Sequence, residues 1–568
     1  MAESAEKTIL GHPRGLVILF LTEMWERFSY YGMRGLLIIY LTQHFLMSDE
    51  SSSVLYGAYG ALVYVMTIIG GSLADRYLGA RKAVTFGAIL LTFGHFGMAF
   101  EGEGSRQLIS HGDNQYEIIL DGRGGDARQQ IVTDLGSSYV SFTETSMDIA
   151  EPGAVGLVPS IDRSEFTMSV ETEEKYLNIL YLSLALIIAG VGFLKANIST
   201  IVGSLYGFGD ARRDSGFTIF YMGINIGAFL ASLSCGYLGI VHGWKYGFGL
   251  AGAGMLLGLV IFLSCQSWLD GKAEPPSVEK IKEKVLFGIN VEWLCYSVGL
   301  GIIAVSMLLV MNADLVGGIL GPVGILMFIW LVSHAFTQLQ GDERSRMLAA
   351  IYFVLAQIPF WALFEQAGSS LNLFTARLVD REIMGWSVPG PVFQSLNAGF
   401  IFLFAPLMAW LWVWLARRKL NPSTPVKFAL GVAMAGLGFL ALVAGMQGSG
   451  AVGLTPVIFI FLIYWIHTMG ELMVSPVGLS AVTKLAPAKI VGMTMGAWFL
   501  YSGLSNYLAG VIARTTGAET IGGQMTNVAA AKAGYVDVYA QVGYIALGIA
   551  LLMLLISPVI NKMMRGAD

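Results

Sequence analysis

Six polar side chains in an otherwise apolar stretch near the start of the chain could carry chemistry. Residues 16–45 are long and apolar enough to cross a bilayer as a helix, yet they contain the sequence EMWERFSYYGMR. At about 100° per residue, one continuous stripe of this helix would carry Glu23, Glu26, Arg27, Tyr30, Tyr31 and Arg34. Because charges in lipid are costly, the stripe must face a protein interior or a watery cavity. We therefore predict a functional charged cluster inside a membrane.

Further polar side chains recur at helical spacing in other apolar segments. They are Lys195 with Ser199, Tyr221 with Asn225, Gln394 with Asn397, the series Gln357, Trp361, Glu365 and Ser369, the series His467, Glu471 and Ser475, and the group Trp498, Phe499, Ser502 and Asn506. The intramembrane bases and acids are nearly balanced, which favours mutual pairing at low dielectric constant. A cavity with opposed charges, amides, hydroxyls and aromatic walls fits a ligand whose positive and negative ends are separated.

The composition places these side chains in a membrane protein. Of the 568 residues, 55% are hydrophobic and 13% are charged, about half the charged fraction of a soluble protein. No long basic run suggests nucleic-acid binding, and no HExxH, GxSxG or Cys/His metal spacing suggests an enzyme or a metal site. The three cysteines lie in or beside apolar segments, which argues against a disulfide framework.

Fourteen apolar segments are long enough to span a bilayer as helices, which predicts an all-α polytopic membrane protein. They are 16–45, 54–74, 83–100, 178–203, 216–240, 246–268, 291–311, 316–338, 347–374, 391–416, 427–446, 454–483, 488–513 and 536–561.

Lysine and arginine gather in every second loop between these segments. These residues are Arg76, Arg81, Lys82, Arg212, Arg213, Lys272, Lys280, Lys282, Lys284, Arg344, Arg346, Arg417, Arg418, Lys419, Lys484, Lys489, Lys562 and Arg565. The loops NADLVGG and GMQGSG on the opposite side contain neither residue type. Since short cytoplasmic loops carry the positive charge, we expect both termini in the cytoplasm.

Residues 101–175 fall between the third and fourth segments, and hence on the extracytoplasmic side. They hold 15 Asp and Glu against 5 Lys and Arg, a net charge of −10. Four short alternating runs, beginning at Gln115, Gln129, Tyr139 and Glu165, predict a small β-rich insert. We expect a solvated cap, with a funnel for cationic ligands or a partner-binding surface as the alternatives.

Several motifs together resemble one transporter family. EMWERFSYYG resembles the ExxERFxYYG motif of proton-dependent oligopeptide transporters, a branch of the major facilitator superfamily. DRYLGARK resembles the superfamily's loop between helices two and three, and GVGFLKANIST and GFTIFYMGINIGA resemble two signatures of the family. FWALFEQAGSS and GELMVSPVGLS resemble its patterns on helices seven and ten. The resemblance covers nearly all of the chain except residues 101–175.

The resemblance implies a major facilitator fold with twelve core helices in two six-helix bundles. Prokaryotic members often insert two extra helices between the bundles, and segments 291–311 and 316–338 fit that place. The implied domains are 1–268 for the N-terminal bundle with the insert, 269–345 for the linker and extra pair, and 346–568 for the C-terminal bundle. The ligand would lie near the midplane between the bundles.

The resemblance also implies a function. It implies a proton-coupled symporter of the bacterial inner membrane, which imports di- and tripeptides by alternating access and acts as a monomer in the lipid bilayer, with protons as its coupling ion and no cofactor. The implied substrate contacts are Arg27, Tyr30, Tyr31, Tyr64, Lys195, Asn225, Trp361, Asn397, Glu471, Trp498, Phe499 and Ser502. Arg27 and Lys195 would meet the peptide carboxylate, and Glu471 would meet its amino group.

The family pattern further implies which residues couple protons to opening. They are Glu23, Glu26, Arg27, Arg34, Lys195, Glu365 and Glu471. Arg34 with Glu365, and Lys195 with Glu471, would form ion pairs between the bundles. Protonating either acid would let the bundles part.

One departure from the pattern concerns histidine. Some members have a histidine on helix two, where this chain has Gly57. We interpret His467, one turn before Glu471, as a packing or hydrogen-bonding residue, because neutral histidine is tolerated inside bundles. A local role in proton transfer is the alternative.

Two other functions stay open at this point. One is proton-coupled transport of another small anion or zwitterion, and the other is a non-transporting receptor that uses residues 101–175 as its sensor. Glu471 together with the complete ExxER set favours peptide transport, since a peptide needs a partner for each terminus. A membrane enzyme is disfavoured because no nucleophile or metal constellation occurs.

Overall fold

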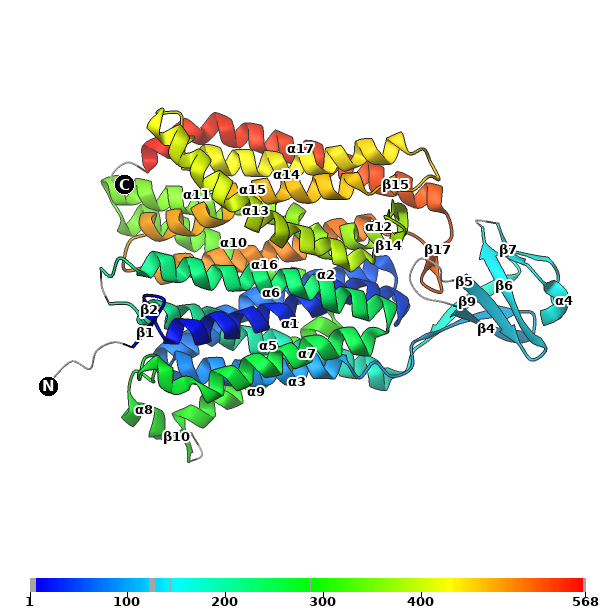
Figure 1. Ribbon diagram of the computed structural model, residues 1–568, viewed down its shortest axis with the longest axis horizontal. Helices are drawn as coiled ribbons and strands as arrows, with labels where there is room; N and C mark the ends of the chain where they lie inside the picture. The colour runs from blue at the N-terminus through cyan, green and yellow to red at the C-terminus, as the bar shows by residue number, and fades with distance from the viewer. Residues whose placement is uncertain (1–6, 122–127, 144, 208, 287, 565–568) are drawn as a thin grey trace.

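The computed structural model describes residues 7–121, 128–143, 145–207, 209–286 and 288–564, and within them fourteen long helical units run side by side (Figure 1). The first eight are α1 (Gly15–Gln43), α2 (Asp49–Leu73), α3 (Ala80–Met98), α5 (Glu174–Ser204), α6 (Arg213–Val241), α7 (Trp244–Ser264), α9 (Val291–Met311) and α10 (Ala313–Gln338). The others are α11 (Gly341–Phe364) with α12 (Ser370–Leu378), α13 (Ser395–Arg417), α14 (Thr424–Gly448), α15 (Ile458–Leu485), α16 (Val491–Thr515) and α17 (Val528–Met563). The predicted all-α fold class is confirmed.

Eleven helices in the described part are long and apolar enough to cross a membrane. α1, α3 and α16 are not among them. α1 carries four charged side chains, and it is embedded by packing against α6 and α7 rather than by its own composition. This is expected for a helix whose charges face the protein interior.

The helices form two halves, each with its own apolar core. α1, α2, α3, α5, α6 and α7 make up the N-terminal half, and α11 to α17 make up the C-terminal half. The halves meet where α2 packs against α16 and α6 packs against α13. At the first of these contacts Gly57 lies against Gly510, and a Cβ on Gly57 would lie 2.8 Å from the Gly510 Cα. Glycine is needed there for the two backbones to approach.

The predicted span 347–374 is not one continuous helix. α11 ends at Phe364, a 3-10 turn η4 (Glu365–Gly368) follows, and α12 starts at Ser370. Pro359 removes one hydrogen-bond donor within α11, and Gly368 lies against the Tyr56 hydroxyl. The predicted series Gln357, Trp361, Glu365 and Ser369 does not lie on one continuous helix. Its last member is wrongly placed, because Ser369 falls beyond the break.

Short helical turns and strand pairs lie in the connections between the long helices. α2 continues as a π-helical turn η1 (Ala74–Leu78), a 3-10 turn η3 (Gln266–Leu269) follows α7, and a 3-10 turn η5 (Gly390–Gln394) precedes α13. α8 spans Val278–Lys282, and the two-stranded pairs are β1 (Thr8–Ile9) with β2 (His12–Pro13), β10 (Lys284–Leu286) with β11 (Ile289–Asn290), β12 (Val379–Asp380) with β15 (Thr455–Pro456), β13 (Glu382–Ile383) with β14 (Trp386–Ser387), and β16 (Thr520–Ile521) with β17 (Gln524–Met525).

The insert between α3 and α5 is a seven-stranded antiparallel sheet with its own small core. Its strands are β3 (Arg106–His111), β4 (Asn114–Asp121), β5 (Arg128–Thr133), β6 (Gly136–Phe142), β7 (Ser146–Ile149), β8 (Ser160–Asp162) and β9 (Phe166–Glu171), and α4 spans Pro152–Val155. The spatial order is β8-β7-β6-β5-β4-β3-β9, and Ile109, Ile118 and Ile131 lie in the core. The predicted β-rich insert is confirmed, and the four predicted runs match β4, β5, β6 and β9; Glu144, the last residue of the third run, lies outside the described residues.

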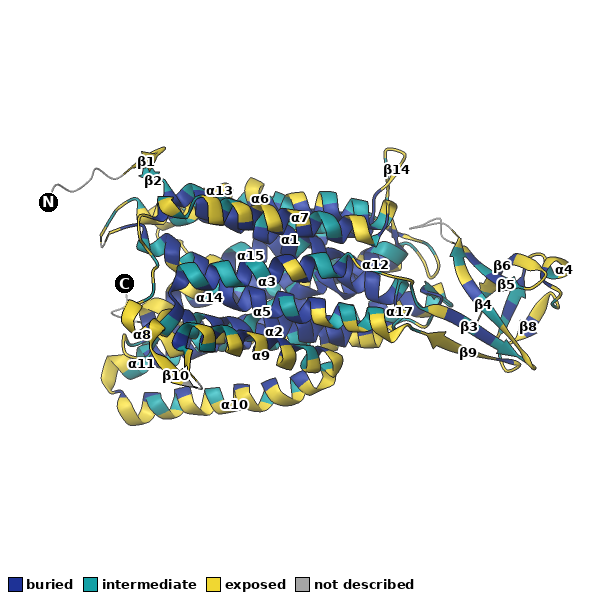
Figure 2. Ribbon diagram, turned by 90° about the horizontal axis from the view of Figure 1, so that it is seen from below, coloured by how far each residue is buried: buried dark blue, intermediate teal, exposed yellow. Residues whose placement is uncertain are grey.

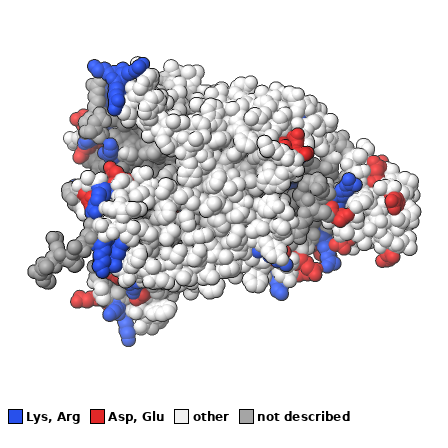
Figure 3. All heavy atoms as spheres, in the orientation of Figure 1, with Lys and Arg blue, Asp and Glu red and all other residues white. Residues whose placement is uncertain are grey.

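The two ends of the helical bundle differ in charge. Figure 1 places the insert at one end and both chain ends at the other, which we name the insert end and the basic end. Figure 3 shows Lys and Arg gathered at the basic end, and a nearly uncharged belt between the two ends. The predicted basic loops all follow helices that finish at the basic end, except that Arg565 lies outside the described residues. The belt provides the surface that a bilayer would cover.

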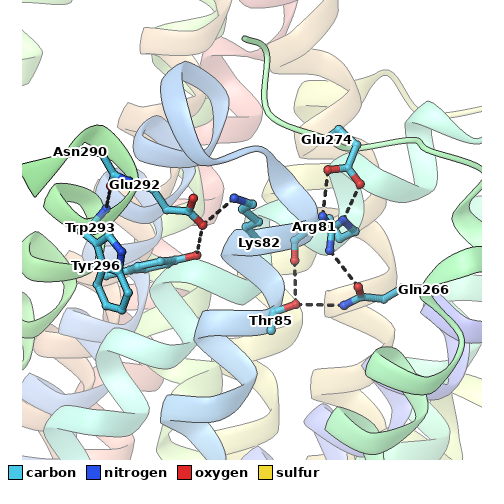
Figure 4. Close-up of polar contacts among 9 residues, drawn as sticks. All are labelled: Arg81, Lys82, Thr85, Gln266, Glu274, Asn290, Glu292, Trp293 and Tyr296. Carbon is cyan, nitrogen blue, oxygen red and sulfur yellow. Dashed lines mark hydrogen bonds and ion pairs between the residues drawn. The ribbon is translucent and has the colours of Figure 1, made fainter. Parts of the chain in front are cut away.

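The linker and the first extra helix are fastened to the N-terminal half by the polar contacts drawn in Figure 4. Lys82 Nζ lies 2.5 Å from Glu292 Oε1 at the start of α9, and Arg81 donates to both oxygens of Glu274 at 2.6 and 2.9 Å. The hydrogen bond from Arg81 holds the pKa of the Glu274 carboxyl below its usual value. α9 packs on α5, whereas α10 packs on α2 and α16 (Figure 2 shows it at the margin of the bundle).

The contact between α9 and the N-terminal half predicts a difference between two glycines on the same helix. A Cβ on Gly299 would lie 2.6 Å from Phe86 Cε1, whereas Gly301 has open space around it. Gly299→Leu should therefore overpack the contact, at a cost of about 1–3 kcal/mol, and lower the melting temperature of the detergent-solubilised protein by several degrees. Gly301→Leu, the matched control, should leave the melting temperature unchanged. Equal melting temperatures for the two variants would contradict this packing.

Candidate functional site

A cavity of 300 Å³ lies between the two halves and is lined by both of them. Fourteen of the residues predicted for substrate contact or gating line it, namely Glu23, Arg27, Tyr31, Arg34, Tyr64, Lys195, Asn225, Trp361, Glu365, Asn397, Glu471, Trp498, Phe499 and Ser502. The structure thus brings together side chains from α1, α2, α5, α6, η4, α11, α13, α15 and α16. Their roles remain predictions, whereas their convergence on one cavity is an observation.

Two predicted residues are not on the cavity wall. Glu26 is fully buried, and Tyr30 is 5% exposed and stacks on Tyr59 with ring centroids 6.5 Å apart. Both lie behind Arg27, because Glu26 pairs with its guanidinium and the Tyr30 ring centroid lies 5.2 Å from Arg27 Cζ. They therefore support Arg27 and do not face the cavity.

Arg27 is the centre of the charged stripe on α1. Its Nη2 donates to Glu26 Oε1 at 2.7 Å, its Nε donates to Glu26 Oε2, and its Nε lies 3.2 Å from Glu23 Oε1. The guanidinium is therefore held by two carboxylates, and its fork engages both oxygens of Glu26. Such bidentate pairing fixes the orientation of an arginine.

Glu23 differs from Glu26 in having one uncommitted oxygen. Glu23 Oε2 is buried and has no hydrogen-bond partner among the described residues, while Oε1 faces Arg27. A buried carboxylate oxygen without a donor is costly, and a proton on that oxygen would remove the charge. The two acids, equivalent in the sequence pattern, are therefore distinct in the structure.

The remaining charges of the cavity lie on opposite walls. Lys195 Nζ, on α5 of the N-terminal half, lies 4.1 Å from the centroid of the Tyr64 ring. Glu471, on α15 of the C-terminal half, accepts a hydrogen bond from Asn397 Nδ2 at 2.8 Å. Within the described part of the chain, the predicted ion pair between Lys195 and Glu471 is not formed in this arrangement. The cavity therefore presents a cation and an acid that are both available to a ligand.

The aromatic part of the wall is built by α11 and α16. Ser502 Oγ donates to Gln357 Oε1 at 3.2 Å, and Gln357 Nε2 donates to the Trp498 carbonyl oxygen at 3.0 Å. These bonds fix the two helices next to each other, so that Trp361 and Trp498 border the same cavity. Ser502 thus has a helix-packing role besides its place on the wall.

Other lining residues extend the predicted set. Tyr221, Gln394, Ser475 and Asn506 belong to the polar series seen in the sequence, although no substrate role was assigned to them. Tyr464 and Ser232 were missed, because one tyrosine or serine in an apolar helix forms no pattern.

The insert side of the cavity is closed by contacts between the halves. Arg34 Nη2 donates to Glu365 Oε2, and Arg34 Nε donates to the Tyr56 hydroxyl at 2.7 Å. The predicted pair between α1 and η4 is therefore formed. Asn372 Nδ2 adds a hydrogen bond of 2.8 Å to the Gly35 carbonyl oxygen.

A second buried ion pair lies beyond the first one, towards the insert end. Arg377 donates to both oxygens of Asp49 at 2.6 and 3.0 Å, and the two side chains are 8% and 2% exposed. Asp49 also accepts from the Ala518 backbone N–H at 3.1 Å. This pair was not predicted from the sequence, because Asp49 and Arg377 lie outside the predicted apolar spans, where charged side chains are usually solvated.

The surroundings of His467 and Gly57 bear on whether a histidine takes part in proton transfer. His467 is 3% exposed, and its Nε2 lies 3.0 Å from the Ala435 carbonyl oxygen. Its ring packs on Phe439 with centroids 5.1 Å apart. A histidine has no room at Gly57, because its Cβ would meet the Gly510 backbone.

Comparison with known proteins agrees with this geometry. The model of the POT family matches residues 81–528. The chain is similar to the uncharacterized transporter YclF of Bacillus subtilis, with 35% identity over 99% of this chain and 97% of that protein. It is also similar to the peptide transporter YePEPT of Yersinia enterocolitica, with 32% identity over 89% and 88% of the two chains. A crystal structure of peptide transporter POT in complex with sulfate covers 99% of this chain and 98% of its own, with 32% identity and a TM-score of 0.75.

The two arginines at the insert end should differ strongly in their contribution to stability. Arg377→Ala leaves the buried Asp49 carboxylate unpaired, which should cost about 3–5 kcal/mol. Arg514, on α16, lies 3.6 Å from both Glu50 and Asp314, but all three side chains are at least 49% exposed. Arg514→Ala should therefore cost less than about 1 kcal/mol. Thermal unfolding of the purified variants tests this order, and equal melting temperatures would contradict it.

Proposed function

Because the chain belongs to the POT family of peptide transporters, we propose that it is a proton-coupled symporter that imports di- and tripeptides by alternating access. The observation that carries the proposal is the pair of opposed charges on the two walls of one cavity. Arg27 and Lys195 lie on the N-terminal wall, and Glu471 lies on the C-terminal wall. A short peptide has a terminal carboxylate and a terminal ammonium group, so its two ends match these charges.

The size of the cavity supports a short ligand. Its 300 Å³ is at the small end of the range of about 300–1,000 Å³ for ligand pockets. Each extended residue adds about 3.3–3.6 Å of chain length, so a di- or tripeptide is about 7–11 Å long. Trp361, Trp498 and Phe499 would then border the variable side chains without fixing their identity.

Proton coupling is supported by the contacts of two acids, Glu23 and Glu365, each of which could be protonated while neighbouring contacts stay in place. In this scheme, Glu23 takes a proton at its unpartnered Oε2 while Glu26 keeps Arg27 in place. Protonation of Glu365 would remove the attraction to Arg34 and release the insert side. Each positive charge that moves inward gains about 2.3 kcal/mol per 100 mV, which can drive uphill uptake.

The orientation follows from the charge difference between the two ends. We infer that the basic end, with both termini, faces the cytoplasm of a bacterial inner membrane, and that the insert faces outside. All charges that the mechanism uses lie within one chain, so the proposal requires only a monomer.

Transport by the purified protein in liposomes tests the proposal. With an inward pH gradient, labelled dialanine should accumulate above its external concentration, and a protonophore should abolish this accumulation. Accumulation of another anion or zwitterion without dialanine uptake would favour a different solute of the same fold class. Absence of any solute movement would favour a receptor.

Substitutions of two charged residues should distinguish proton-driven uptake from exchange of substrate across the membrane. Glu23→Gln and Lys195→Ala should abolish gradient-driven uptake, because one loses the oxygen that takes the proton and the other loses a cavity cation. Glu23→Gln should retain counterflow exchange of dialanine, since the cavity keeps its shape. Glu292→Gln, which changes a carboxylate on α9 outside the cavity, serves as the control and should transport normally. Normal accumulation by Glu23→Gln would exclude this scheme.

His467 should affect stability without affecting the pH dependence of uptake. Within the described ranges, its side chain has one hydrogen bond, to a backbone carbonyl, and ring contacts with Phe364 and Phe439, and it forms no ion pair with an acid. His467→Ala should lower the melting temperature and leave the pH profile of uptake unchanged. A profile displaced along the pH axis would assign the proton to His467 instead.

A further inference from the structure

The insert contacts a hairpin that belongs to the opposite half of the molecule. β16 and β17 form a hairpin at residues 520–525, between α16 and α17 of the C-terminal half. Its tip is Gly522 and Gly523, with φ of +52° and +78°, as a two-residue hairpin turn requires. Ile521, Gly522 and Gly523 are buried, which is unusual for the tip of a loop at the end of a helical bundle.

Two glutamines of the insert hold this tip. Gln129 Nε2, on β5, donates to the Ile521 carbonyl oxygen. Gln107 Oε1, on β3, accepts from the Gly522 backbone N–H at 3.3 Å. The same Gln107 amide donates to the Ser169 carbonyl oxygen on β9 at 3.1 Å, which fixes its orientation. Both glutamines are almost fully buried, at 6% and 7% exposure.

The contact fits the shape of the sheet. Gln107 pairs with Ile118 on the neighbouring strand, and Ile118 pairs with Ile131, two residues from Gln129. All four side chains therefore point to the same face of the sheet, because side chains alternate along a strand. The hairpin tip closes the end of this face. A Cβ on Gly522 would lie 3.1 Å from Gln129 Nε2 and 3.5 Å from Ile118.

The insert itself is anchored to the N-terminal half. Its first strand, β3, follows α3 in the chain, and its last strand, β9, leads into α5. At its base, Ser105 N donates to the His44 carbonyl oxygen at 2.8 Å, and Lys245 N donates to Glu101 Oε2 at 2.9 Å. The hydrogen bonds to the hairpin therefore cross from one half of the molecule to the other, outside the ion pairs that close the insert side of the cavity.

We propose that Gln107 and Gln129 are gating residues, and that the insert is a latch which holds the insert side closed by gripping the 520–525 hairpin. The proposal rests on the proposed function only in requiring that the halves part at the insert end. Opening there would break both hydrogen bonds, so the latch favours the closed arrangement in the free protein. Both hydrogen bonds use neutral amides, so neither of them contains a group that a proton would neutralise.

Distances between spin labels on the two halves test the latch without any substrate. The labels are placed at His242→Cys in the N-terminal half and Val452→Cys in the C-terminal half, in full-length protein whose three native cysteines are replaced. Neither position lies in the insert or the hairpin. Gln107→Ala combined with Gln129→Ala should raise the ratio of long to short distances by about tenfold or more, since each hydrogen bond contributes a factor of roughly 3 to 10.

The matched control is Gln130→Ala, on the same strand. Its amide donates to Asp121 within the insert at 3.2 Å and belongs to the other face of the sheet. This variant should leave the distance distribution unchanged. Gly522→Asn provides a second route, because asparagine tolerates a positive φ and places a side chain against Gln129 and Ile118. It should shift the distribution in the same direction as the double variant.

The outcomes separate the latch from the transport proposal. Unchanged distances in both the double variant and Gly522→Asn would overturn the latch, even if dialanine uptake is normal. A shift in both variants supports the latch, even if the transported solute proves not to be a peptide. Equal shifts in Gln130→Ala and the double variant would also overturn it, because the effect would then come from loosening the sheet.

Discussion

The cost of keeping the Arg27 guanidinium inside a membrane protein constrains the rest of the site. A buried arginine stays charged, so it must be surrounded by acids that are themselves buried. Glu26 meets this need with both oxygens, and Glu23 meets it with one. The cluster can exist only where other helices cover it, which is why the first helix is embedded by α6 and α7 of its own half rather than by lipid.

The residues of the polar stripe on α1 therefore have three different positions and contacts. Glu26 and Tyr30 hold Arg27 from behind, Glu23 and Tyr31 face the cavity beside it, and Arg34 reaches the opposite half at Glu365. Two acids in adjacent turns could titrate as one unit. The structure distinguishes them, because the second oxygen of Glu23 accepts no hydrogen bond among the described residues while both oxygens of Glu26 are engaged.

Features that follow from periodicity along the chain could be predicted from the sequence, whereas contacts between distant helices could not. Hydrophobic periodicity predicted the fourteen helices and the insert, and helical spacing identified most of the residues of the cavity wall, because both patterns are local along the chain. The break at Glu365–Gly368 and the pair of Asp49 with Arg377 were missed. The first depends on the approach of Gly368 to Tyr56, and the second joins residues far apart in the chain, so neither leaves a local pattern.

The contacts that close the insert end are of two chemical kinds, and this difference has a consequence for coupling. Arg34 with Glu365, and Arg377 with Asp49, each contain a carboxylate that a proton can neutralise. The hydrogen bonds from Gln107 and Gln129 to the hairpin contain no titratable group. Protons can therefore neutralise the two ion pairs directly, but not these two hydrogen bonds. In the proposed mechanism, these hydrogen bonds favour closure together with the ion pairs. Neutralising the ion pairs therefore opens the outer side only if the open arrangement then becomes more stable than the closed one with its two hydrogen bonds.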